Sequence, residues 1–165
     1  MNNRGDIAFE GDLTAPPNAN AQIGVFLYSG GIITAIARPG DPMPGGGKLV
    51  NASLVDANIH INSRQEVVYS AVIHDDADPA NIFHTGLFQW SHGQLGVIVR
   101  AGTIIPGVGT IEELLPPQLV FPPSPITTTT SGAINNDAGQ VLFTATLTDG
   151  RGVLLLATPA PPQRR

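Results

Sequence analysis

The chain has 165 residues, which is enough for one domain with a substantial core, and it carries a formal net charge of −5 with only 13% charged residues. Its eight lysines and arginines are scattered, which argues against a nucleic-acid partner, because binding to phosphates needs clustered positive charge. Cysteine is absent, so disulfides and thiolate metal sites are excluded. No stretch has the roughly 20 apolar residues of a membrane helix, and the first residues lack the apolar segment of a signal peptide.

The chain begins with a short sequence motif that recurs twice. The motif starts at Asn2, Asn62 and Asn136, and in each copy apolar and polar residues then alternate, over 7–13, 67–73 and 141–147. Alternation with period two predicts a β-strand that has one face inward.

A second shared block follows the first strand in two of the copies. Residues 24–47 and 86–109 share glycine, arginine and proline landmarks that lie 62 residues apart. Each block reads as a strand with a Gly-x-Phe start, a short glycine-containing turn and a second strand, which predicts an antiparallel hairpin. The hairpin strands are expected at 24–28 with 32–38 and at 86–90 with 94–100.

After the Pro-Gly-x-Gly turn at 44–47 comes a looser alternating stretch, 48–60, which we expect to be a fourth strand. The second copy holds an insertion rich in proline and threonine at 116–130, which is unsuited to a central strand. The predicted units are 1–60, 61–133, a partial unit at 134–158 and a tail at 159–165.

The predicted fold is all-β: tandem four-strand antiparallel meanders, amounting to about two and a half propeller-like blades. The hairpin strands are apolar on both faces, which is typical of sheets that are covered on both sides. Stacked β-solenoid coils would meet the same demand. Two and a half blades do not close a propeller, so we expect open sheet edges that favour a homo-oligomer.

The repeat also resembles a group of uncharacterised, usually exported bacterial proteins with propeller-like domains of unknown function, many of which have a C-terminal sorting anchor. Residues 134–147 and 37–45 carry most of the resemblance. The chain departs from the pattern at Gln65, where glycine is usual, and at Thr103, where aspartate is usual, and no sorting anchor follows Pro159. The resemblance implies a β-repeat fold and an exported or cell-surface location, and it implies no reaction.

Four residues are candidates for ligand binding. Tyr28 and Trp90 end equivalent strands, with Leu156 assigned to that position in the third copy, and outward-facing aromatic rings can stack on sugars. Packing of these rings is the favoured interpretation. Arg38 and Arg100 end the next strand, where a tie to a carboxylate or carbonyl is favoured over a ligand clamp.

Three aspartates are candidates for metal binding. Asp75, Asp76 and Asp78 follow His74 in a connection that has no counterpart in the other copies. Oxygen ligands this close could hold Ca²⁺, or a transition metal if histidine joined them. The run lacks the glycine and the distal glutamate of an EF-hand loop, so a solvated acidic loop is favoured.

We therefore predict a non-catalytic β-repeat scaffold or interaction module, whose partner is an unidentified protein or a glycan. A carbohydrate-binding, lectin-like module is the first alternative, and a metal-dependent hydrolase is the second. Catalytic residues are not assigned, because the spacing of histidines and carboxylates gives no nucleophile with a base beside it.

Overall fold

The structure is a computed structural model that describes residues 1–13, 22–52, 59–74, 83–114 and 133–159. These residues contain strands and turns and no helix, so the prediction of an all-β fold is confirmed. Within the same ranges, nothing has the length and apolarity of a membrane-spanning helix. The insertion at 116–130 lies outside the described residues.

The strands form three antiparallel sheets, none of them closed. The first sheet has the order β1-β2-β3 and consists of β1 (Ile7–Asp12), β2 (Ile23–Ser29) and β3 (Ile32–Ala37). The second has the order β4-β6-β7-β8, with β5 also on β6; its strands are β4 (Lys48–Asn51), β5 (His60–Ile61), β6 (Val67–His74), β7 (Phe83–Ser91) and β8 (Gln94–Arg100). The third has the order β11-β12-β10-β9, with β13 also on β12; its strands are β9 (Ile104–Ile105), β10 (Gly109–Glu113), β11 (Ile134–Asn135), β12 (Val141–Leu147) and β13 (Gly152–Ala157).

The fourth strand of a repeat does not close its own meander. Instead β4 pairs with β6 of the next repeat, Lys48 opposite His74, and β10 pairs likewise with β12. The expected strand over 48–60 is replaced by β4 and β5, which both pair with β6. Each sheet boundary is therefore offset from the repeat boundary, and this exchange of strands ties successive repeats together.

The two predicted hairpins are present and have two-residue turns. Ser29 lies opposite Ile32, and Ser91 lies opposite Gln94. Both turn residues have positive φ in each hairpin, with Gly30 and Gly31 in the first and His92 and Gly93 in the second. Positive φ at both central residues is typical of the type I′ turn, which matches the twist of the paired strands. Because glycine adopts positive φ easily, this turn accounts for the glycines at these positions.

The Gly-x-Phe start of these hairpins has a packing reason. The Phe88 ring folds back over Gly86, where a β-carbon would lie 2.7 Å from the ring. Phe26 covers Gly24 in the same way, and there the corresponding distance is 3.2 Å. Glycine is needed here for space, because any side chain would displace the ring.

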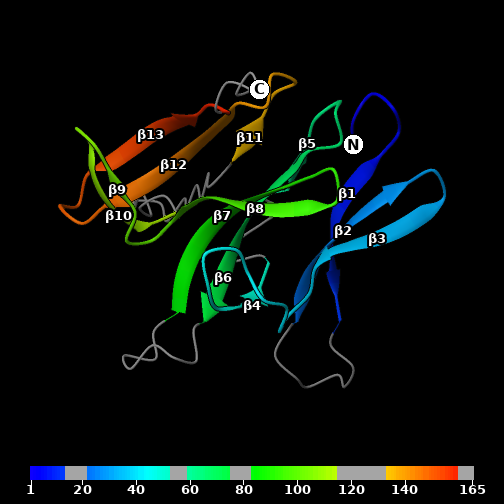
Figure 1. Cartoon of the computed structure of the whole chain (residues 1–165), viewed down its shortest axis with the longest axis horizontal. Helices are drawn as coiled ribbons and strands as arrows, with labels where there is room; N and C mark the ends of the chain where they lie inside the picture. The colour runs from blue at the N-terminus through cyan, green and yellow to red at the C-terminus, as the bar shows by residue number, and fades with distance from the viewer. Residues whose placement is uncertain (14–21, 53–58, 75–82, 115–132, 160–165) are drawn as a thin grey trace, which may run out of the picture.

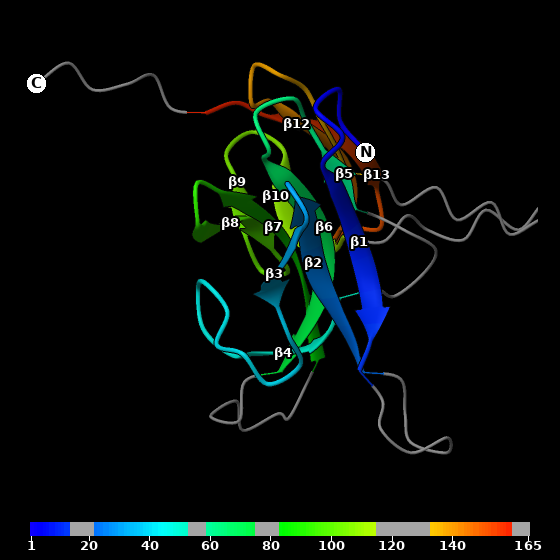
Figure 2. The ribbon, with the colours of Figure 1, turned by 90° about the vertical axis from the view of Figure 1, so that its right-hand side faces the viewer.

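The three sheets lie face to face, with the second between the other two (Figures 1 and 2). Val67, Tyr69 and Phe88 of the second sheet pack against Val25 and Leu27 of the first. On its opposite face, Val68 and Leu87 pack in a second cluster with residues of β12 such as Phe143. The second sheet is thus buried on both sides, as its apolar strands predicted.

Candidate functional site

Each repeat opens with a turn built around one asparagine. The side-chain oxygen of Asn62 accepts hydrogen bonds from the backbone amides of Arg64 and Glu66, at 3.0 and 2.9 Å. Asn2 and Asn136 make the same pair of bonds in their own turns. The conformation requires a positive φ three residues on, where Gly5 and Gly139 stand.

Gln65 takes this left-handed conformation in the second copy, with a φ of 63°. Its side chain donates to the Ser29 hydroxyl at 3.0 Å, so the residue that departs from the repeat pattern links the second repeat to the first. Thr103, the other departure, accepts a bond from the amide of Arg100 as Asp41 does from that of Arg38. Both departures therefore preserve the local backbone.

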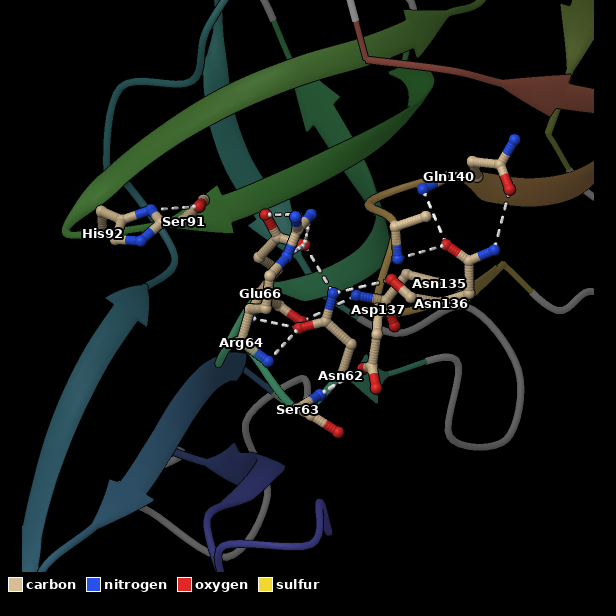
Figure 3. A network of polar contacts seen from close by, with 11 residues as sticks. Asn62, Ser63, Arg64, Glu66, Ser91, His92, Asn135, Asn136, Asp137 and Gln140 are labelled. Atoms are coloured by element: carbon tan, nitrogen blue, oxygen red, sulfur yellow. Dashed lines mark hydrogen bonds and ion pairs between the residues drawn. The ribbon is translucent and has the colours of Figure 1, made fainter.

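The asparagine side chains also join one repeat to the next. The Asn2 amide donates to the Asn62 carbonyl at 3.0 Å, and the Asn62 amide donates to the Asn136 carbonyl at 2.9 Å. Asp137 accepts a further bond from the Ser63 backbone amide (Figure 3). We call this series of bonds the asparagine ladder. Asn62 in its middle is buried, whereas Asn136 at its end is exposed.

A polar side chain four residues after each asparagine completes the turn. Asp6, Glu66 and Gln140 each accept a bond from the asparagine amide. Glu66 also forms an ion pair with Arg64, at 2.8 Å. Hydrogen bonds from the side chains of Ser29, Asn2 and Gln65 lower the pKa of Asp6, because they favour its charged form.

The two arginines predicted as ligand residues have different hydrogen-bond partners. Arg100 donates to the Gly46 carbonyl at 3.0 Å, so it ties β8 to the Pro-Gly-x-Gly turn of the preceding repeat. Arg151 does the same to the Val108 carbonyl, which is the equivalent turn position one repeat later. Arg38 is exposed, and its backbone amide is bound by Asp41. This geometry agrees with the structural interpretation of Arg100.

The two predicted aromatic residues differ in exposure. Trp90 is half-buried and packs against the cluster between the first and second sheets. Tyr28 is 39% exposed, with Ile7 and Ile33 directly opposite it on the neighbouring strands. The third-copy assignment to Leu156 is wrong by one residue, because Ala157 is the residue opposite Val141, as Tyr28 is opposite Ile7.

The outer side of the first sheet carries exposed apolar residues at positions whose equivalents in the second sheet are packed. We call Ile7, Phe9, Phe26, Tyr28 and Ile33 the first-sheet outer face. Phe9 and Phe26 are stacked with ring centroids 5.6 Å apart, which parallels the 5.9 Å between Tyr69 and Phe88 in the second sheet. The row Ile7, Tyr28, Ile33 corresponds by register to Val67, Trp90, Leu95, which packs onto a neighbouring sheet.

The surface also has open hollows. One of about 390 Å³ is lined by Phe83, His84, Thr85, Ala101, Glu112 and Glu113. Within the described ranges, no three histidine, aspartate or glutamate side chains gather as metal ligands. Asp75, Asp76 and Asp78 lie outside those ranges, so their predicted metal binding stays a prediction.

Sequence reasoning missed the outer face because alternation alone does not say which strand faces lack a covering sheet. The available clue was that the first copy repeats the pattern of the second, including its aromatic pair. That pattern predicts that this face is covered in every copy. In the first copy it is not covered, since Ile33 is 62% exposed.

A protein-family model, described as a family of unknown function (DUF7453), matches residues 1–116. No curated protein and no solved structure matches the chain. The family match agrees with the resemblance to proteins of unknown function, while a bacterial origin stays a prediction.

Proposed function

The chain belongs to the family of unknown function DUF7453, which suggests no reaction for it, and we propose from its geometry that it is a non-catalytic β-repeat interaction module. Its contact surface is the first-sheet outer face. The observation that carries the proposal is the exposed row Ile7, Tyr28, Ile33 at positions that are packed against a neighbouring sheet in the next repeat.

Chemistry favours an apolar contact there. An aligned apolar surface on a soluble chain marks an interaction site more often than a scatter of single residues does. The stacked Phe9 and Phe26 rings give this face a rigid centre, and aromatic groups of this kind are enriched at protein interfaces.

An apolar dye tests whether the face is accessible. We expect anilinonaphthalene sulfonate to bind the native chain, and Ile33→Lys to lower its fluorescence because the charge disrupts the face. Phe83→Lys is the matched control, since Phe83 is also 62% exposed but lies on the second sheet. Equal dye binding by the parent chain and Ile33→Lys would count against this face as the contact surface.

Carbohydrate binding is the alternative that concerns the same residue. A sugar needs hydrogen-bonding partners beside the stacking ring, and the cross-strand neighbours of Tyr28 are two isoleucines. We therefore expect a glycan array to remain blank with the parent chain. Binding that Tyr28→Ala abolishes would instead favour the lectin-like alternative.

The hydrolase alternative and the exported location each keep a separate test. Calorimetric titration with Ca²⁺ and Zn²⁺ would show heat if Asp75, Asp76 and Asp78 hold a metal. Fractionation of the source cells would test whether the protein works at the cell surface.

A further inference from the structure

We propose that a second copy of this chain docks head to tail, its first-sheet outer face covering the outer side of the third sheet. This inference rests on the proposed function and names the partner of the same face. Its basis is an interface that already occurs twice inside the chain.

The two internal interfaces pair the same two kinds of sheet face. The side of the second sheet that carries Val67 and Tyr69 packs on the first sheet. The side of the third sheet that carries Val141 and Phe143, the equivalent residues, packs on the second. In the first sheet this side is the outer face, and no sheet of the described residues covers it.

The complementary half lies on the other end of the molecule. Register places Leu154 and Leu156 at the positions of Val25 and Leu27, because Thr144 and Leu142 stand opposite them as Glu10 and Ala8 do in the first sheet. Val25 and Leu27 are 0% and 4% exposed beneath the second sheet. Leu154 and Leu156 are 66% and 57% exposed.

The asparagine ladder gives the direction and register of docking. Each asparagine amide donates to the carbonyl of the asparagine in the following repeat, first from Asn2 and then from Asn62. Continuing the series, the Asn136 amide would donate to the Asn2 carbonyl of a second copy. That direction is the one in which the third sheet of one copy meets the first sheet of the next.

Such an interface is heterologous, so it generates a ring if the rotation closes and an open chain if it does not. One sheet face is small compared with a stable protein interface, which places the affinity in the micromolar range or weaker. The parent chain should therefore gain mass with concentration in sedimentation velocity, from micromolar to submillimolar protein. A fixed mass above the monomer indicates a ring and also supports the proposal; a monomer throughout overturns it.

Two charge variants test which faces meet. Ile33→Lys blocks the first-sheet outer face and Leu154→Lys blocks the outer side of the third sheet, and both sites are exposed enough to accept lysine without unfolding. Each variant alone should associate at least tenfold more weakly than the parent, since an apolar contact is replaced by a buried charge. Phe83→Lys, on the second sheet, should associate like the parent.

Mixing the two variants is the decisive step. The intact third sheet of Ile33→Lys can meet the intact first sheet of Leu154→Lys, and the product then has both free faces blocked. The mixture should thus contain a dimer and nothing larger. Dimers of either variant alone that form as strongly as those in the mixture would indicate a symmetric contact between like faces and overturn the head-to-tail arrangement.

Asn136→Asp tests the ladder. The aspartate keeps the oxygen that accepts the bonds of its own turn but lacks the amide that would donate to a second copy. Association should weaken while the melting temperature changes little, and unchanged association would contradict the proposed register. If the chain stays monomeric while its face still binds the apolar dye, the docking proposal fails and the interaction-module proposal stands; if neither is seen, both fail.

Discussion

At the scale of single residues, equivalent asparagines have different surroundings. Asn62 in the middle of the ladder is buried, and Asn136 at its end is exposed. We expect Asn62→Asp to destabilise the fold by about 2 to 4 kcal/mol, because it sets a buried carboxylate against Glu66 and against the Asn136 carbonyl. Asn136→Asp should cost about 0.5 kcal/mol or less, since the residue is exposed and the Gln140 amide can turn to donate. Urea unfolding at pH 7 measures both, and equal losses would contradict the ladder.

Tyr69 places a hydroxyl group in the hydrophobic core. Its ring is completely buried, and its hydroxyl has no hydrogen-bond partner among the described residues. Burial therefore raises the pKa of this hydroxyl, since the charged form would be poorly solvated. Phe9 and Phe143 stand at the equivalent positions.

Removing that hydroxyl should help. Tyr69→Phe is expected to stabilise the fold by about 1 kcal/mol, because an unpaired buried hydroxyl loses its bonds to water on folding. Urea or thermal unfolding is the measurement. A loss of stability of the same size would mean that the hydroxyl has a partner in solution.

At the scale of elements, the hairpins depend on glycines that give room to a ring. We expect Gly86→Ala to destabilise by about 1 to 3 kcal/mol, because its β-carbon would meet the buried Phe88 ring at 2.7 Å. Gly96→Ala is the matched change on the paired strand, where the nearest atom is 3.8 Å away, and it should be close to neutral. Equal unfolding midpoints for the two variants would show that the Gly-x-Phe motif has another cause.

The strands and hairpins were predictable because their causes are local. Alternation from Val67 to Ile73 and the glycines at the turns depend only on near neighbours in the chain. The pairing of β4 with β6 was missed, since nothing in residues 48–51 says whether they join the strands before or after them. Of the candidate site, the sequence identified Tyr28. The asparagines marked only the start of each repeat, because the ladder that joins them depends on how the repeats stack.

At the scale of the whole molecule, carboxylates at the repeat junctions couple stability to pH. Asp6 is bound by the side chains of Ser29, Asn2 and Gln65, and Asp137 by the backbone and side chain of Ser63, and these bonds lower the pKa of each carboxyl. A lowered pKa means that the stabilisation is complete above the unfolded value of 3.8 and is lost as pH falls through the folded value. Acid should therefore weaken the contacts between sheets.

His60 adds an earlier step with the same sign. Burial lowers its pKa below 6.5, so the unfolded chain takes up a proton first and stability begins to fall below about that pH. We expect the urea midpoint to be level above pH 7, to decline modestly below 6.5 and to drop more steeply below 4. A midpoint that is level down to pH 3 would contradict both assignments.

Two variants assign the steeper part to the junctions. Asp6→Asn and Asp137→Asn each remove a carboxylate whose protonation opposes folding, so each should have a lower midpoint at pH 7 and a shallower decline below pH 4 than the parent. Asp149→Asn is the control, because the Arg151 side chain lowers its pKa within one exposed turn of the third repeat. If the two junction variants and the control flatten the decline of the urea midpoint equally, acid destabilises single turns. If the junction variants flatten it more, Asp6 and Asp137 stabilise the contacts between the sheets, beside the asparagine ladder.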